Sequence, residues 1–131
     1  MTDPAEPQLP LLLYVEDELL IQNIVIDCLE DAGYRLVIAD SGEEALKLLS
    51  AHRAELRGMI TDINLGEGLD GWEIARTARQ SIDGLPVVYV SAASHDDWSS
   101  QGVPGSVMIA KPFATSQLVV AISSLLVVSD S

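Results

Sequence analysis

A chain of 131 residues, of which 48% are apolar and 21% charged, is long enough for one domain with its own hydrophobic core and too apolar for a disordered polypeptide. Its formal net charge of −13 argues against nucleic acid as a direct partner, because phosphate backbones are bound by basic surfaces. The longest apolar run, 118–128, is interrupted by serines and is too short to span a bilayer, so we expect no membrane association. The single cysteine, Cys28, excludes an internal disulfide and fits a reducing cytoplasm.

The expected domain covers residues 10–128. Residues 1–9 contain acids and prolines but lack the segments of a signal peptide, so we expect a disordered lead-in, and residues 129–131 are expected to be a short tail. Residues 11–15 form a continuous apolar run, typical of a strand buried on both faces. The helix after it ends at Gly33. Its apolar residues, which recur at helical spacing and are expected to face the core, are Ile21, Ile24, Val25, Cys28 and Leu29.

The same alternation continues along the chain. Residues 35–39 are the second expected strand, and a capping box formed by Ser41 and Glu44 opens the helix that follows it. Further apolar runs predict strands at 58–61, 87–90 and 107–109. The remaining helices are expected at 72–83, 95–100 and 115–128.

Five apolar strands alternating with five helices predict an α/β fold with a parallel sheet. Because crossovers in such a sheet are right-handed almost without exception, the carboxyl ends of all strands lie along one edge. Ligands of open α/β sheets bind at this edge. The reactive side chains expected there are Glu16, Asp17, Asp62, Ser91 and Lys111.

The three acids of this set predict a metal site. Carboxylates that lie close together repel one another unless a cation neutralises them, and hard oxygen ligands suit Mg²⁺. We expect Asp17 and Asp62 to be direct ligands, with Glu16 acting through water. A backbone carbonyl near Asn64 completes the expected set.

A phosphate bound beside this metal needs a second cation and a hydroxyl donor, which Lys111 and Ser91 can supply. A carboxylate can itself attack phosphorus and form an aspartyl phosphate. Asp62 lies centrally among the strands and is placed for that role. The sequence therefore predicts phosphoryl chemistry with Asp62 as the acceptor.

In these features the chain resembles the receiver domains of two-component response regulators, of the stand-alone chemotaxis type. The resemblance covers residues 11–128. Each motif is weak alone, but their order and spacing together are specific. The motifs are Glu16-Asp17, Asp62, Asp70-Gly71, Ser91-Ala92 and Lys111-Pro112-Phe113.

The resemblance implies a flavodoxin-like, doubly wound sheet of order 2-1-3-4-5 with five helices. It also implies Mg²⁺-dependent phosphorylation of Asp62 by a histidine kinase or a phosphotransfer protein, and a cis peptide bond between Lys111 and Pro112. No output domain follows the pattern, so we expect a stand-alone cytoplasmic protein that binds a downstream protein or serves as a phosphorelay shuttle or sink. Apart from slow self-dephosphorylation, we expect no enzyme activity.

Two positions depart from the family's pattern. Gly66 stands where a proline is usual, four residues after the phosphorylated acid, and the loop is one residue longer. Met108 stands where a tyrosine or phenylalanine is usual, three residues before the lysine. The usual inward swing of an aromatic side chain therefore cannot be carried over to Met108, although methionine is flexible enough to fill alternative gaps.

Three other functions fit parts of this pattern. A phosphorylation-independent interaction module would fit Met108 but leaves the complete set of acids, serine and lysine unexplained. A nucleotide binder needs an anion cradle after its first strand, where Glu16-Asp17-Glu18 would repel an anion. A phosphatase with an aspartate nucleophile needs a second acid two residues on, and Asn64 stands there.

Two helices carry more apolar residues than one buried face requires, which often marks an interface. On the first helix these are Leu19 and Ile26, where we expect a kinase or phosphotransfer helix to dock. On the last helix, Leu118, Ala121, Ile122 and Leu125 are expected to face inward. The surplus residues, which predict a homodimer or another partner contact, are Val119, Val120, Val127 and Val128.

Overall fold

The computed structural model describes residues 9–92 and 95–130, so most of the expected lead-in and the last residue of the tail lie outside the described residues. Five parallel strands form one sheet in the order β2-β1-β3-β4-β5, as predicted. The strands are β1 Leu11–Val15, β2 Arg35–Ala39, β3 Leu56–Asp62, β4 Val87–Ser91 and β5 Val107–Ala110. The helices are α1 Leu19–Asp31, α2 Gly42–Ala51, α3 Gly71–Ser81, α4 Trp98–Gln101 and α5 Thr115–Asp130.

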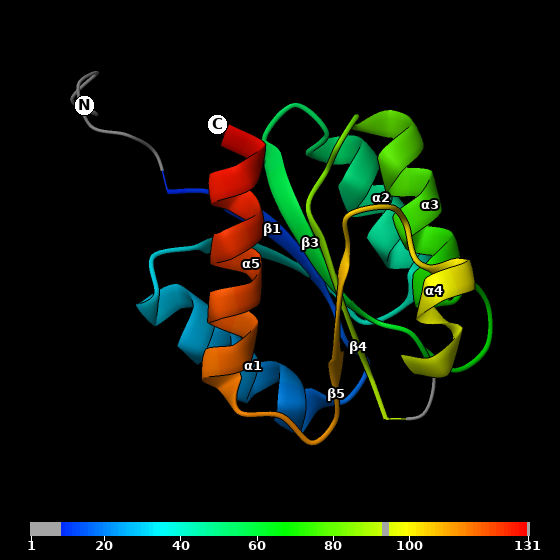
Figure 1. Ribbon diagram of the computed structural model, residues 1–131, viewed down its shortest axis with the longest axis horizontal. Helices are drawn as coiled ribbons and strands as arrows, with labels where there is room; N and C mark the ends of the chain where they lie inside the picture. The colour runs from blue at the N-terminus through cyan, green and yellow to red at the C-terminus, as the bar shows by residue number, and fades with distance from the viewer. Residues whose placement is uncertain (1–8, 93–94, 131) are drawn as a thin grey trace.

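Helices cover both faces of the sheet (Figure 1). Helices α1 and α5 lie on one face, where Leu12, Ile60 and Ile122 are fully buried. Helices α2 and α3 lie on the other face, where Met59 and Ile74 are fully buried. Side chains of successive strand residues point to opposite faces, so a central strand such as β3 contributes to both hydrophobic layers. This explains why the strands read as continuous apolar runs.

The expected helix at 95–100 contains the shortest of the described α-helices. A single 3-10 turn, His95–Asp97, leads into α4, which has four residues. Gly102 follows directly, and a hydrogen bond from the Arg76 guanidinium to the Gln101 carbonyl, 3.4 Å long, links α4 to α3. None of the described helices combines the length and apolarity needed to cross a bilayer.

Two helix faces differ from the prediction. Ile24, which was expected in the core, is 60% exposed, whereas Ile26 is half-buried against the core. The buried stripe of α1 is Gln22, Val25 and Leu29, and Ile24 lies about 100° around the helix axis from Val25. On α5 the predicted surplus residue Val119 is half-buried beside the core residue Leu118.

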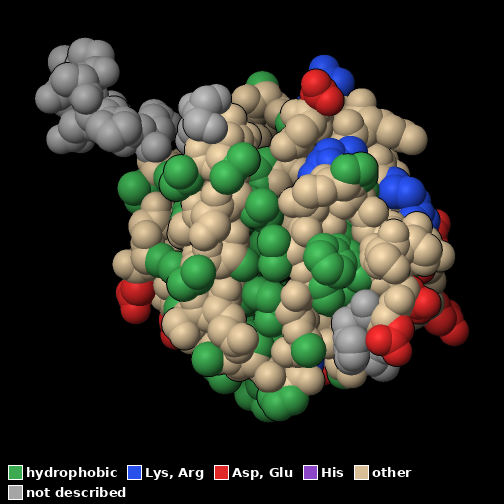
Figure 2. Space-filling model, in the orientation of Figure 1, with side chains coloured by type: hydrophobic (Ala, Val, Ile, Leu, Met, Phe, Trp, Pro, Cys, Tyr) green, Lys and Arg blue, Asp and Glu red, His purple; other side chains and the backbone are tan. Residues whose placement is uncertain are grey.

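The surface of α5 remains apolar after this correction. Val120, Val127 and Val128 are between 64% and 72% exposed. Hydrophobic side chains gather along α5 and in the strip beside it in Figure 2, while acidic and basic side chains lie mainly at the margins of this face. The prediction of an apolar patch on α5 is therefore confirmed, with three of its four residues.

Gly71, the first residue of α3, makes a close backbone approach that no larger residue fits. A Cβ at this position would lie 2.3 Å from the Asp62 carbonyl oxygen. Gly71→Ala should therefore lower the free energy of unfolding by about 1–3 kcal/mol, as measured by urea denaturation, because the backbone has to shift. Gly66→Asn is the control in the same loop, since Gly66 has open space and a left-handed backbone that asparagine tolerates. Equal stability of the two variants would contradict this packing.

Candidate functional site

Asp62 is the last residue of β3, and only 7% of its side chain is exposed. The chain on both sides fixes its position. The Thr61 hydroxyl donates to the Asp62 carbonyl oxygen at 2.7 Å, and the Asn64 N–H donates to Asp62 Oδ1 at 3.3 Å. The contact of Asn64 is thus through its N–H, while the expected role of its carbonyl as a metal ligand remains a prediction.

Glu16 and Asp17 follow β1, the strand that pairs with β3, and so reach the same edge of the sheet. Glu16 is buried and Asp17 is exposed. One carboxylate oxygen from each of Glu16, Asp17 and Asp62 lies within 4.8 Å of the other two. The three acids predicted from the sequence therefore form one cluster, and its all-oxygen donor set suits Mg²⁺.

Lys111 provides the positive charge of the site. It follows β5, and its Nζ lies 2.9 Å from Asp62 Oδ2 and 3.5 Å from Glu16 Oε1. The Lys111–Pro112 peptide bond is cis, as the resemblance implies. Burial lowers the pKa of Lys111, but its hydrogen bond to Asp62 and the charges of Asp62 and Glu16 outweigh burial and raise the pKa overall. Lys111 therefore stays charged at neutral pH.

One lysine does not balance the cluster. Burial, reinforced by the charge of Asp62, raises the pKa of Glu16 from 4.5 to about 7, although Lys111 and a hydrogen bond from the Glu18 N–H oppose the rise. Burial is the larger cause, and the contribution of Asp62 shows that negative charge in the cluster adds to it. Three carboxylates beside one lysine leave an excess of negative charge. A divalent cation would remove that excess, so the residues present fit Mg²⁺.

Ser91 completes the predicted set at the end of β4. It is fully buried, and its carbonyl oxygen accepts a hydrogen bond from the Lys111 N–H at 2.9 Å. In the register of β3 and β4, Asp62 pairs with Val90, so Ser91 is the next residue outward. Ser91 and Lys111 are therefore tied to each other by backbone at the edge that carries Asp62.

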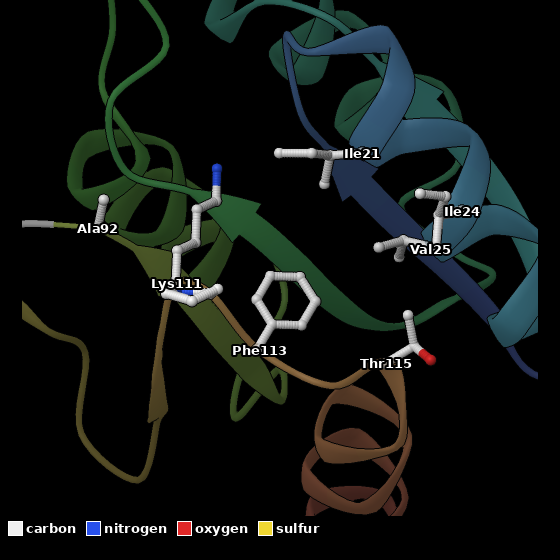
Figure 3. Close-up of a pocket in the computed structure, with 8 residues that line it drawn as sticks. Ile21, Ile24, Val25, Ala92, Lys111, Phe113 and Thr115 are labelled. Atoms are coloured by element: carbon white, nitrogen blue, oxygen red, sulfur yellow. The ribbon is translucent and has the colours of Figure 1, made fainter.

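An apolar groove of about 360 Å³ opens beside Lys111. It lies between the first turns of α1 and the segment that joins β5 to α5 (Figure 3). In this view the ring of Phe113 lies between the Lys111 side chain and the α1 residues. The groove is lined by Ile21, Ile24, Val25, Ala92, Lys111, Pro112, Phe113 and Thr115.

Position 108 on β5 carries methionine where an aromatic residue is usual, but the neighbouring residue on β4 is a tyrosine. Met108 pairs in register with Tyr89, which is fully buried. The Tyr89 hydroxyl accepts a hydrogen bond from the Val103 N–H at 3.1 Å, and its ring lies against Trp72 with centroids 4.6 Å apart. Tyr89 therefore ties the loop before β5 to the strand that ends at Ser91.

Sequence reasoning missed two polar residues that hold the site. Thr61 lies in an apolar strand and Gln22 in an apolar helix stripe, and each donates to a backbone carbonyl of an acidic residue of the cluster. Both residues could have been found in the sequence as polar residues at positions expected to be buried, because a buried polar side chain needs a hydrogen-bond partner.

Comparison with known proteins agrees with this geometry. The sequence matches the response regulator receiver domain family over residues 12–123. A response regulator receiver protein from Sinorhizobium medicae shares 35% identity and superposes with a TM-score of 0.87, covering 91% of this chain and 95% of the other. The N-terminal domain of a response regulator/sensory box/GGDEF protein from Carboxydothermus hydrogenoformans shares 31% identity at a TM-score of 0.73, covering 92% and 96%. The chain belongs to the response regulator receiver domain family.

The curated relatives are response regulators that extend beyond the matched region. SaeR from Staphylococcus aureus is 33% identical over 118 residues, which cover 88% of this chain and 50% of SaeR. The transcriptional regulatory protein AfsQ1 from Streptomyces coelicolor is 36% identical over 88 residues, covering 67% of this chain and 37% of AfsQ1. The match thus spans half or less of the length of these relatives.

The raised pKa of Glu16 predicts a pH dependence of stability. With a folded-state pKa of about 7 and an ordinary value of 4.5, Glu16 binds more protons in the folded state, so its contribution to the free energy of unfolding falls as pH rises from about 4.5 through 7. Urea denaturation of the metal-free protein at pH 5 and pH 8 measures this. Glu16→Gln should reduce the loss of stability between these two pH values. An unchanged loss in the variant would contradict the assignment.

Proposed function

We propose that this chain accepts a phosphoryl group on Asp62 from a phosphohistidine of a histidine kinase or a phosphotransfer protein. The observation that carries the proposal is the cluster of Glu16, Asp17 and Asp62 with Lys111 at 2.9 Å from Asp62. Membership of the receiver family supports the same chemistry.

In the transfer step, an oxygen of the Asp62 carboxylate forms a bond to phosphorus while the bond between phosphorus and the imidazole nitrogen of the donor breaks. The electron pair of the broken bond stays on the imidazole, and the product on this chain is an acyl phosphate. Lys111 neutralises negative charge on the phosphoryl oxygens, and the Ser91 hydroxyl can donate a hydrogen bond to one of them.

Mg²⁺ is the cofactor of this proposal. Glu16, Asp17 and Asp62, with the backbone carbonyl of Asn64, are the groups that would hold it. When bound, Mg²⁺ supplies charge neutralisation at the phosphoryl oxygens. The phosphoryl group is itself negative and would lie beside the three acids. The single positive charge of Lys111 could not compensate the acids and the phosphoryl oxygens together.

The donor docks, in this proposal, at the apolar groove beside Lys111. Leu19, Leu20 and Ile24 on α1 are between 60% and 81% exposed, and Ile24 also lines the groove. Exposed apolar side chains that border a reactive site suit a helix that presents its histidine to Asp62.

The output is proposed to be binding of a downstream protein in the cytoplasm, or passage of the phosphoryl group along a relay. In this view the chain is a phosphoacceptor with slow self-dephosphorylation at most, and binds neither nucleic acid nor membranes. A phosphorylation-independent interaction module is the alternative function, and Met108 at the position usual for an aromatic residue favours it. A measurement of phosphorylation on Asp62 distinguishes the phosphoacceptor from the interaction module.

Self-association through α5 is the proposed use of its apolar patch. Val127→Asp places a charge in that patch and should lower the sedimentation coefficient of a dimer to that of a monomer, because a charge is costly to bury. Gln80→Glu, at an exposed position of α3 on the opposite face of the sheet, should leave the oligomeric state unchanged. Identical sedimentation of wild type and Val127→Asp over a concentration series would contradict this interface.

Phosphorylation itself is tested by intact mass after incubation with a small phosphodonor such as acetyl phosphate. The wild type should gain one phosphoryl group in the presence of Mg²⁺ and lose most of the gain when Mg²⁺ is chelated. Asp62→Asn should gain none under either condition, because an amide oxygen does not form the acyl phosphate. An adduct of equal size in Asp62→Asn would contradict the proposed acceptor, and no adduct together with no Mg²⁺ binding would favour the interaction module.

Docking is tested separately from chemistry. Ile24→Asp should slow transfer from a purified phosphotransfer protein by about tenfold, since roughly 1.4 kcal/mol of apolar contact corresponds to that factor. The rate with acetyl phosphate should stay the same, because the variant leaves the acidic cluster intact. Leu9→Asp is the matched control, since Leu9 is 53% exposed against 60% for Ile24 and precedes β1, at the edge of the sheet opposite the strand carboxyl ends. Equal transfer rates of the two variants would exclude the groove as the docking site.

A further inference from the structure

Helix α1 buries a glutamine and exposes its leucines. Gln22 is 9% exposed, whereas Leu19 and Leu20 are 66% and 81% exposed. Buried polar residues are the informative exceptions in a folded protein, because an amide removed from water needs compensating hydrogen bonds. The buried position of Gln22 therefore calls for a specific partner.

That partner is the backbone of the loop that carries two of the acids. The Gln22 side-chain amide donates to the Glu16 carbonyl oxygen at 3.0 Å, and the Gln22 N–H donates to the Glu18 carbonyl oxygen at 2.9 Å. The Glu16 N–H is itself bound to the Ala39 carbonyl oxygen on β2 at 3.0 Å. The backbone N–H and carbonyl of Glu16 are thus each fixed, the first by the sheet and the second by Gln22.

The loop needs such support because its acids repel one another. The oxygens of Glu16, Asp17 and Asp62 lie within 4.8 Å, and like charges at this distance favour movement of the exposed Asp17 away from the cluster. The N-cap of α1, Glu18, makes no side-chain capping bond, so the helix start does not fix the loop by that route. A further hydrogen bond within the loop, from the Glu18 N–H to Glu16 Oε2, is 3.3 Å long.

A neutral donor suits this position better than a charged one. A lysine or arginine at position 22 would add positive charge near the acids, which would weaken the attraction of the cluster for a cation. Glutamine holds the peptide through an amide hydrogen bond and leaves the negative charge of the cluster in place.

We propose that Gln22 is a positioning residue for cation binding. It holds the Glu16 peptide so that Glu16 and Asp17 stay beside Asp62 before Mg²⁺ binds. Because the loop is already ordered, its loss of conformational entropy does not reduce the Mg²⁺ binding free energy. The proposal deepens the proposed function, since it concerns the same site, but it makes its own claim about Mg²⁺ affinity. Groups that orient metal ligands in this way typically change metal affinity by about 10- to 100-fold when removed.

Gln22→Met tests the proposal, because methionine has nearly the same size and no donor. The readout is the thermal midpoint as a function of Mg²⁺ concentration, in which stabilisation by a bound ion rises with the ratio of ion concentration to Kd. Gln22→Met should need about tenfold more Mg²⁺ for the same stabilisation. Asn23→Met, at the neighbouring exposed position, should match the wild type.

A rate measurement separates positioning from general damage. With acetyl phosphate as donor, Gln22→Met should raise the Mg²⁺ concentration for half-maximal phosphorylation while the rate at saturating Mg²⁺ stays near that of the wild type. If Gln22→Met does not fold, Gln22→Leu takes its place, which puts an apolar residue on the buried stripe that Val25 and Leu29 share.

Unchanged Mg²⁺ affinity in the folded variant, or equal weakening in Asn23→Met, would overturn the role of Gln22. A rate loss that saturating Mg²⁺ does not restore would overturn it as well. Failure of the proposed function gives a different result. In that case the wild type would remain unphosphorylated in the intact-mass experiment, whereas its Mg²⁺-dependent stabilisation would still depend on Gln22.

Discussion

The site depends on one electrostatic imbalance. Three carboxylates meet at the carboxyl edge of the sheet, and a single lysine, Lys111, lies against Asp62 and Glu16. Burial, reinforced by the charge of Asp62, raises the pKa of Glu16, so both burial and the neighbouring acid disfavour its charged form. Carboxylates this close together repel one another, and a divalent cation would offset that repulsion. The proposed binding of Mg²⁺ and of a phosphoryl group rests on this imbalance.

The rest of the fold serves to hold these groups in place. The strand order puts β3 between β1 and β4, so that Asp62 lies beside both the acids after β1 and Ser91 on β4. Hydrophobic layers on both faces of the sheet make the strand ends rigid points of attachment. Small polar contacts then set the details, as Thr61 does for the Asp62 carbonyl and Gln22 for the Glu16 carbonyl.

The strands and the site residues were predictable because each depends on local pattern. Continuous apolar runs indicate strands buried on both faces, and parallel topology brings their carboxyl ends together. The sequence alone therefore predicts that Asp62 and Lys111 lie close together. The rotation of α1 could not be predicted in the same way. Helical spacing is compatible with more than one face, and Ile24 was placed in the core although Gln22 occupies the buried stripe. Gln22 is satisfied on that stripe by its hydrogen bond to the Glu16 carbonyl oxygen, a contact that the spacing of apolar residues does not reveal.

Mg²⁺ binding measured by titration calorimetry at pH 8 tests the central claim, that the acidic cluster is a cation site. The account predicts one ion per chain for the wild type and no measurable binding for Asp17→Asn, since Asp17 is the exposed member of the cluster and its loss should leave the fold intact. Binding of the same stoichiometry and affinity in both proteins would contradict the account, as would the absence of binding to the wild type.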